Sequence, residues 1–247
     1  FHEYLQNEAH WRAFKRAVER AHEAGFSLWL YDEKGYPSAT AGGLVLKGHP
    51  EWQARGLLVA ETTSEGGPVK LELPPGDLRL AAAFPTRNGD LQLDTSTNLD
   101  RQIQDRTLTW QAPKGSWRVM VITESPLHEG THADMSLSEH IPYPNLLDPA
   151  PTARFLELTH AAYAQHLSQN LGDYFVSTFT DEPSLMSLFL RPMPYRVLPW
   201  SATLNEEFAK RRGTALEPLI PALVADAGPA GRRARYQYWQ TIGELTA

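Results

Sequence analysis

Hydrophobic residues recur at two different periods along the chain, and the period changes twice. Near the start, apolar side chains lie three or four positions apart, at Trp11, Phe14, Val18 and Ala21. This spacing is typical of an amphipathic helix, and Gly25 is a suitable residue to end it. The apolar run 26–31 follows. The first part of the chain therefore predicts a helix followed by a strand.

The middle of the chain has the pattern of strands with no helical stretch between them. Turn-forming residues, among them Asn88-Gly89, separate short runs that are rich in β-branched or alternating apolar residues. Strands are predicted at 57–61, 69–73, 78–84, 91–94, 107–111 and 117–123. Consecutive short strands of this kind favour a small antiparallel β-sandwich.

The helical period returns after about residue 140. Asp148 is a good N-cap, and Pro149 fits the first position of a helix that Gly172 would end. The apolar run 174–179 then predicts a buried parallel strand. Further helices are predicted from Ser201 to Gly213, over 216–224 and over 232–246.

The three segments together predict an α/β fold with an insertion. Residues 1–55 and 126–247 are expected to form a partial TIM-type β/α barrel, and residues 56–125 an inserted antiparallel β-sandwich. A closed barrel of this type has eight strands, but only two convincing parallel strands are predicted. The barrel is therefore expected to be incomplete. Because the sequence begins with Phe1 rather than methionine, we expect a fragment of a longer protein.

Both predicted parallel strands end in an acidic pair. The run 26–31 is followed by Asp32-Glu33, and the run 174–179 is followed shortly by Asp181-Glu182. Polar groups at the carboxyl ends of barrel strands project into the pocket where chemistry is done. Enzymes that cleave glycosidic bonds use two carboxyl groups, one as acid and one as base or nucleophile. The alternative is that these acidic residues only cap the turns after the strands.

Composition narrows the range of functions. A net charge of −6 without a basic run argues against nucleic acid as a partner. No apolar segment approaches the roughly 20 residues that a membrane span requires. The chain has no cysteine, which excludes disulfides and thiolate metal ligands. It also contains no G-x-S-x-G elbow, G-x-G-x-x-G motif or P-loop, so esterase and nucleotide chemistry are not indicated.

A series of motifs stands in the same order as in one group of enzymes. The motifs lie at 29–33, 36–38, 41–43, 110–117, 145–149, 159–163, 179–185, 198–200 and 235–239. Together they resemble the α-L-rhamnosidase-like glycoside hydrolases, family 106 and its uncharacterised relatives. The resemblance implies a TIM-barrel core and hydrolysis of O-glycosidic bonds in plant or bacterial polysaccharides.

The chain also departs from the pattern of that group. Ala39 stands where glycine is expected after Pro37-Ser38. Proteins of the group begin with a further βα unit and continue well past Ala247 with more barrel strands. The departures leave open that the second catalytic carboxylate of the group lies outside this chain.

The catalytic role is expected to belong to the second acidic pair. Cleavage needs a proton on the leaving oxygen, and Glu182, at the end of an apolar strand, is the candidate general acid. Asp181 is expected to contribute a neighbouring negative charge. The rival hypothesis is a non-catalytic carbohydrate-binding protein or an inactive fragment, in which the same residues hold sugar without cutting a bond.

Substrate binding is expected from residues near the strand ends. Asp32 and Glu33 are predicted to bind sugar hydroxyls, with a second carboxylate, a calcium site or plain turn capping as alternatives. Aromatic faces stack on sugar rings, and His140 is expected at the rim of the pocket. The predicted aromatic contacts are Tyr31, Tyr36 and Trp200, whereas Trp29 is expected to pack in the core because it lies in the middle of its strand.

The stretch 128–134 combines histidines with acidic residues, and imidazole and carboxylate groups suit zinc. However, its spacing matches no helical histidine pair, and Gly130 favours a loop that returns from the insertion. We therefore predict no metal site and no cofactor apart from the calcium alternative. His160 is expected to have a structural role. A carbohydrate is the expected partner, while the pattern does not indicate an oligomeric state or a cellular location.

Overall fold

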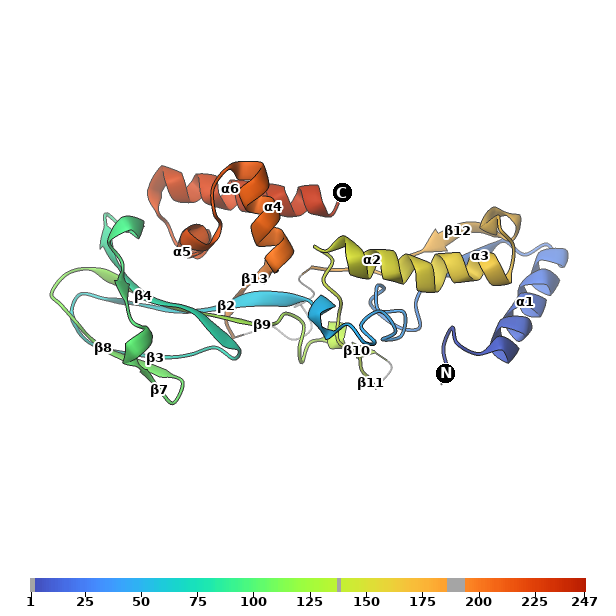
Figure 1. Cartoon of the computed structure of the whole chain (residues 1–247), viewed down its shortest axis with the longest axis horizontal. Coiled ribbons are helices and arrows are strands. Elements are labelled where there is room, and N and C mark those ends of the chain that lie inside the picture. The colour runs from blue at the N-terminus through green and yellow to red at the C-terminus, as the bar shows by residue number, and fades with distance from the viewer. Residues whose placement is uncertain (1–2, 137–138, 186–193) are drawn as a thin grey trace. The chain divides into compact units, whose positions relative to one another are not determined.

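The computed structural model describes residues 3–136, 139–185 and 194–247 (Figure 1). The chain divides into two compact units. The first comprises Phe1–Ala54 and His128–Arg191, and the second comprises Arg55–Leu127 and Pro192–Ala247. Each unit is therefore built from two separate stretches of the chain.

The first unit is built around an amphipathic helix and two parallel strands. Its elements are α1 (Glu8–Glu23), β1 (Leu28–Tyr31), β10 (Met135–Ser136), β11 (Glu139–His140), α2 (Pro149–Leu156), α3 (Ala162–His166) and β12 (Phe175–Phe179). β1 and β12 pair in parallel, whereas β10 and β11 form a small antiparallel pair. A π-helical turn, Glu157–Ala161, joins α2 to α3. The core of this unit consists of Trp11, Val18, Leu30, Tyr163, Leu167 and Phe175.

The second unit is an antiparallel β-structure with helices on one side. Its strands are β2 (Arg55–Ser64), β3 (Gly67–Glu72), β4 (Asp77–Arg87), β5 (Asp90–Leu91), β6 (Thr97–Asn98), β7 (Ile103–Gln104), β8 (Thr107–Ala112), β9 (Trp117–Pro126) and β13 (Arg196–Trp200). Its helices are α4 (Ala202–Arg212), α5 (Ile220–Val224) and α6 (Gly228–Leu245). The main sheet has the order β13-β2-β9-β4-β5, with β6 paired to β4, and a smaller sheet has the order β3-β8-β7.

Both faces of the main sheet are buried within the second unit. Alternate residues of β4 point to opposite faces, as the pleat of a strand requires. Ala81 and Ala83 belong to the core that includes Leu108 of the smaller sheet. Ala82, by contrast, packs in a cluster with Ala225, which follows α5. Figure 1 shows the smaller sheet on one side of β4 and β9 and the helices on the other.

The structure confirms most of the predicted elements. α1, the final helix and the strands predicted at 57–61, 69–73, 78–84, 107–111 and 117–123 form where the periodicity predicts them. The strand predicted at 91–94 is shorter and earlier, since β5 covers Asp90–Leu91 and Leu93–Thr95 form a 3-10 turn. The helix predicted after Ser201 is α4, and the Ser201 hydroxyl accepts a 3.0 Å hydrogen bond from the backbone N–H of Leu204. Gly213 ends α4 in the left-handed conformation, with φ 71°. Local signals were therefore sufficient for these elements.

The predicted fold class is wrong, because most strands are antiparallel. Within the described ranges, β1 and β12 are the parallel pair, and an eight-stranded parallel barrel is not seen. Residues 196–200 do not contribute to a barrel, since they form β13 and pair antiparallel with β2. β12 was predicted to be buried, yet Phe175 is its one buried residue. Its other side chains remain accessible because β1 is the strand paired with it.

The predicted division at 1–55, 56–125 and 126–247 stays a prediction. In the structure the stretch that contains β2 to β9 is compact together with residues after 191, not by itself. β13 explains this grouping, because it extends the main sheet from its β2 edge.

Candidate functional site

The two acidic strand ends lie side by side in the first unit. Because β1 and β12 are parallel, their carboxyl ends meet at the same edge of the pair. The backbone N–H of Asp32 donates to the carbonyl of Phe179 at 3.3 Å. The backbone N–H of Ser38, in the loop after β1, donates to the carbonyl of Asp181 at 2.8 Å. Backbone contacts thus join the turn after β1 to the turn after β12.

Asp32 is fully buried and bonded within the protein. The Ser38 hydroxyl donates to its Oδ1 at 2.7 Å, and the Thr180 hydroxyl donates to its Oδ2 at 2.5 Å. The Ser38 hydroxyl oxygen in turn accepts a 2.8 Å hydrogen bond from the backbone N–H of Asp181. Asp32 therefore connects the end of β1, the loop and the turn that carries Glu182. This geometry suits a positioning residue better than a substrate ligand.

Glu33 is also buried, and its carboxylate holds the loop that follows β1. Five backbone N–H groups donate to it, from Lys34, Ala39, Thr40, Ala41 and Gly42. Their distances to the two carboxylate oxygens range from 2.7 to 3.3 Å. Ala39 and Ala41 both have positive φ, 124° and 48°, in this loop. Because both oxygens are occupied, Glu33 has little capacity left to bind a substrate.

Glu182 differs from these two residues because its side chain is exposed. The Tyr36 hydroxyl donates a 2.7 Å hydrogen bond to Oε2 of Glu182. That hydrogen bond, together with partial burial, raises the pKa of Tyr36 to about 12. Glu182 also has a positive φ of 41°, a conformation that is uncommon outside glycine and that concentrates at tight turns and functional sites.

A second tyrosine holds the other carboxylate of this pair. The Tyr31 hydroxyl donates to Oδ2 of Asp181 at 3.1 Å and also contacts the carbonyl of Gly35. Burial, and next the hydrogen bond to Asp181, raise the pKa of Tyr31. The Tyr31 ring lies 5.8 Å from the ring of Phe179 on β12, centroid to centroid. Tyr31 and Tyr36 thus each donate to one carboxylate of the second acidic pair.

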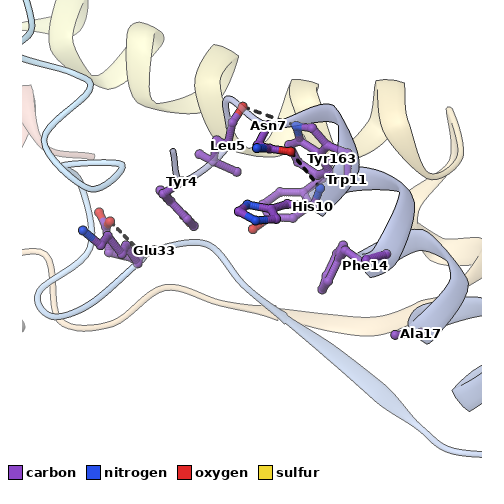
Figure 2. Close-up of a pocket in the computed structure, with 11 residues that line it drawn as sticks. Tyr4, Leu5, Asn7, His10, Trp11, Phe14, Ala17, Glu33 and Tyr163 are labelled. Carbon is purple, nitrogen blue, oxygen red and sulfur yellow. Dashed lines mark hydrogen bonds between the residues drawn. The ribbon is translucent and has the colours of Figure 1, made fainter. Parts of the chain in front are cut away.

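Among the residues that the structure describes, two cavities adjoin these side chains. The larger one, about 630 Å³, lies between α1 and the loop after β1 (Figure 2). Its lining is mainly apolar and aromatic, and includes Tyr4, Leu5, Trp11, Phe14 and Tyr163, with Glu33 near one end. The smaller one, about 190 Å³, has apolar residues together with five polar ones in its lining: Asp32, Ser38, Thr152, His160 and Thr180. Pro183, one of these apolar residues, directly follows Glu182 in the chain, but Glu182 itself does not line this cavity.

Three other residues discussed in the sequence analysis have different surroundings. His140 is exposed on β11, and its Nε2 lies 3.1 Å from Oδ2 of the buried Asp134. Trp200 is 2% exposed in the second unit, where the Arg79 guanidinium lies 5.8 Å from the centre of its ring. The expectation that Trp29 packs in the core is wrong. Its side chain is 64% exposed, because it points away from the side of β1 that buries Leu30.

Two hydroxyl residues that hold the site together were not predicted. Ser38 and Thr180 both donate to Asp32, and the Tyr143 hydroxyl donates to the carbonyl of Ser38 at 2.7 Å. Tyr143 also accepts a 3.1 Å hydrogen bond from the backbone N–H of Ser184. The available signal was the position of Thr180 immediately before the acidic pair. Burial raises the pKa of Tyr143, so its hydroxyl stays protonated and keeps donating.

No group of three or more histidine, aspartate or glutamate side chains placed to hold a metal ion occurs in residues 3–136, 139–185 and 194–247. In the same ranges no helix is long and apolar enough to cross a membrane. No protein-family model matches the chain, and no curated protein matches it.

Proposed function

We propose that the chain is a glycoside hydrolase in which Glu182 is the general acid. The observation that carries this proposal is the contrast among the four acidic residues at the two strand ends. Asp32 and Glu33 are buried, and both oxygens of each accept hydrogen bonds from within the protein, whereas Glu182 is exposed. A group that delivers a proton to a substrate must be reachable by that substrate.

The tyrosine beside Glu182 suits this chemistry. Tyr36 donates to Oε2, and Oε1 of Glu182 is the oxygen proposed to face the substrate. When Glu182 gives up its proton to the leaving oxygen, its carboxylate gains negative charge. A hydrogen bond from Tyr36 is then stronger than before, because the acceptor is ionised. Tyr36 is therefore proposed as a residue that stabilises the conjugate base of the acid.

Asp181 is proposed as the neighbouring carboxylate. Tyr31 holds its side chain, and its backbone N–H is bonded to Ser38. A carboxylate fixed in this way can stabilise positive charge that develops on the sugar ring as the glycosidic bond breaks. Asp32 and Glu33 then serve the reaction by holding the two turns in place rather than by touching the sugar.

The test is hydrolysis of a panel of aryl glycosides, α-L-rhamnoside included, by the chain and by its Glu182→Gln variant. We expect cleavage of at least one member and a fall in kcat of about 100-fold or more in the variant. Glu23→Gln, at the exposed end of α1, is the matched control and should keep full activity. Cleavage that persists in Glu182→Gln would overturn the role of Glu182.

A second candidate function is carbohydrate binding without cleavage. One exposed carboxylate and accessible aromatic residues, Trp29 and Phe179, are sufficient to hold a sugar. This candidate predicts that sugars bind with saturation while no aryl glycoside is cleaved. Calorimetric titration with the sugars that correspond to the aryl glycosides separates the two functions.

A further inference from the structure

The second unit contains a polar cavity between its main sheet and the start of α4. The volume of this cavity is about 290 Å³. Its lining comes from β4, β9, β13 and α4, and consists of Arg79, Glu124, Trp200, Ala202, Asn205 and Glu206. Charged and polar side chains therefore make up most of its wall. Such a wall favours a small polar ligand over a hydrocarbon, because polar groups taken out of water need polar partners.

A β-bulge in β4 brings Arg79 to this cavity. Its neighbours Leu78 and Leu80 pair with two adjacent residues of β9, Thr123 and Ile122. Arg79 is therefore the extra residue of the bulge and has no partner of its own on β9. Bulges redirect a side chain out of the regular alternation of a strand, and they are frequent next to active sites. The bulge thus gives a charged side chain access to the cavity.

The guanidinium group of Arg79 is held by two contacts. Its Nε lies 3.3 Å from Oε2 of Glu124, and its central carbon lies 5.8 Å from the centre of the Trp200 ring, within cation–π range. Glu124 neutralises Arg79 only in part, because its Oε1 lies 2.5 Å from Nε of Arg55. In the ranges that the structure describes, the two terminal nitrogens of Arg79 make no hydrogen bond to the protein. A guanidinium fixed in this way presents a planar pair of donors, which matches a carboxylate.

Helix α4 contributes a negative charge to the same cavity. Ala202, Asn205 and Glu206 are three and four positions apart, so they lie on one side of the helix, and all three line the cavity. Among the described residues, Glu206 makes neither an ion pair nor a hydrogen bond, so no contact joins it to Arg79. The cavity therefore has a cation and an anion in its wall that do not neutralise each other directly.

We propose that this cavity binds a small zwitterion, whose carboxylate is bound by Arg79 and whose ammonium group is bound by Glu206. A molecule with both charges satisfies both side chains. A simple carboxylate would instead be repelled by Glu206, and a simple amine by Arg79. Free α-amino acids and their longer ω-amino analogues have this chemistry. The site lies in the second unit and does not depend on the proposed hydrolase activity.

The test uses zwitterions with increasing separation of the two charges: glycine, β-alanine and γ-aminobutyrate. Each is titrated into the ¹⁵N-labelled chain at low salt while the indole N–H of Trp200 is followed by NMR. We expect a saturable shift of this signal with at least one of the three. If none of them binds, the inference is wrong.

Two analogues of the best-binding zwitterion test the need for each charge. Its carboxamide lacks the negative charge, and the carboxylic acid with a methyl group in place of the ammonium group lacks the positive one. Both analogues have nearly the size of the zwitterion. Because each loses a hydrogen bond between charged groups, we expect each to bind at least about 10-fold more weakly. Equal binding of either analogue would overturn the inference.

Variants place the binding within this cavity. Arg79→Met and Glu206→Gln should each weaken binding of the zwitterion by at least about 10-fold. Arg87→Met, at the exposed end of β4, and Glu72→Gln, at the exposed end of β3, are the matched controls and should bind like the unchanged chain. Undiminished binding in Arg79→Met or Glu206→Gln would show that the ligand sits elsewhere and would overturn the inference.

The Glu206→Gln variant also separates a direct contact from a loss of structure. Glu206 is exposed on α4, so the variant is expected to fold even if Arg79→Met does not. Without the negative charge, the zwitterion and its methyl analogue should bind with equal affinity. A general loss of structure would instead weaken both and leave their ratio unchanged. An unchanged ratio would therefore contradict the contact between Glu206 and the ammonium group.

Discussion

At the scale of single residues, the four acidic side chains at the strand ends have two different kinds of surroundings. Asp32 and Glu33 lie inside the protein with their oxygens occupied, whereas Glu182 is exposed with one tyrosine beside it. Asp181 is intermediate, because it is partly buried and bonded to Tyr31. The four carboxyl groups therefore differ in how accessible they are to a ligand.

Glu33→Gln is expected to destabilise the first unit. The amide would replace one acceptor oxygen with an NH₂ group that faces backbone N–H donors. Because hydrogen bonds to a charged acceptor contribute about 1.5–3 kcal/mol each, we expect the free energy of unfolding to fall by about 3 kcal/mol. Urea unfolding measures this loss. Glu23→Gln, whose side chain is exposed, should change it by less than about 0.5 kcal/mol, and equal losses in both variants would contradict the role of Glu33.

The titration of Tyr36 should report on Glu182. Its pKa is raised to about 12, chiefly by the hydrogen bond to Glu182. A raised pKa means that Tyr36 contributes stability below its ordinary pKa of about 10, and that this contribution is lost as pH rises through about 12. In Glu182→Gln the pKa of Tyr36 should move back towards 10. NMR of ¹³Cζ-labelled tyrosine measures both values, and an unchanged pKa would contradict the contact.

At the scale of elements, strands and helices form where short-range signals are strong. The Asn88-Gly89 turn joins β4 to β5, and Ser201 and Gly213 bound α4. β13 was not predicted. It contains Pro199 and is an edge strand of its sheet, where proline is tolerated. Which strands pair is a long-range property, so the pattern predicted the strands of the sandwich but not the sheet that they share with β13.

The close approach of β9 to the start of β4 depends on one glycine. Gly76 has φ +98°, and a Cβ atom added there would lie 2.1 Å from the carbonyl oxygen of Glu124. Gly76→Ala must therefore displace backbone, and we expect a loss of at least about 3 kcal/mol in the free energy of unfolding. Thermal and urea unfolding give the value.

Gly89→Ala is the matched control for that substitution. Gly89 has a similar φ, +88°, but a Cβ there would meet nothing within 4 Å. Its replacement should cost only the conformational strain of about 1–2 kcal/mol. If both variants lose the same free energy of unfolding, the clash with Glu124 does not contribute to the effect of Gly76→Ala.

At the scale of the whole molecule, the two units differ in how their sheets are built. In the second unit, β9 lies between β2 and β4 and is paired on both sides. In the first unit, β1 and β12 pair with each other as a two-stranded sheet. Small sheets of two strands are marginal by themselves, so the first unit depends on α1 and on the bonds of Asp32 and Glu33.

Amide hydrogen exchange should separate the two units. Amides of β9 are expected to exchange more slowly than those of β12, since strands paired on both sides open only with the whole unit. Exchange measured by mass spectrometry on peptides that cover 117–126 and 175–179 tests this. Equal protection of both peptides would contradict the difference between the sheets.

The sequence predicted the site less completely than it predicted the elements. The acidic pairs are visible as Asp-Glu after apolar runs, and their closeness follows from the parallel pairing of β1 with β12. The internal bonding of Glu33 was not predictable, because it requires positive φ at Ala39 and Ala41, which side-chain patterns do not encode. The fold class failed for a different reason, since it depends on which segments distant in the chain pair with one another.

The hydrogen bond from Tyr31 to Asp181 joins residues that are 150 positions apart, and this distance has a consequence for biosynthesis. A ribosome that adds about 5–20 residues per second needs on the order of 10 seconds to cover it. Strands β2 to β9 emerge during that interval and can pair with one another before β12 is made, whereas β13, the second partner of β2, follows later. During this time α1 and β1 have no β12 to pair with. They therefore remain accessible to chaperones and proteases until the turn that contains Asp181 and Glu182 leaves the ribosome.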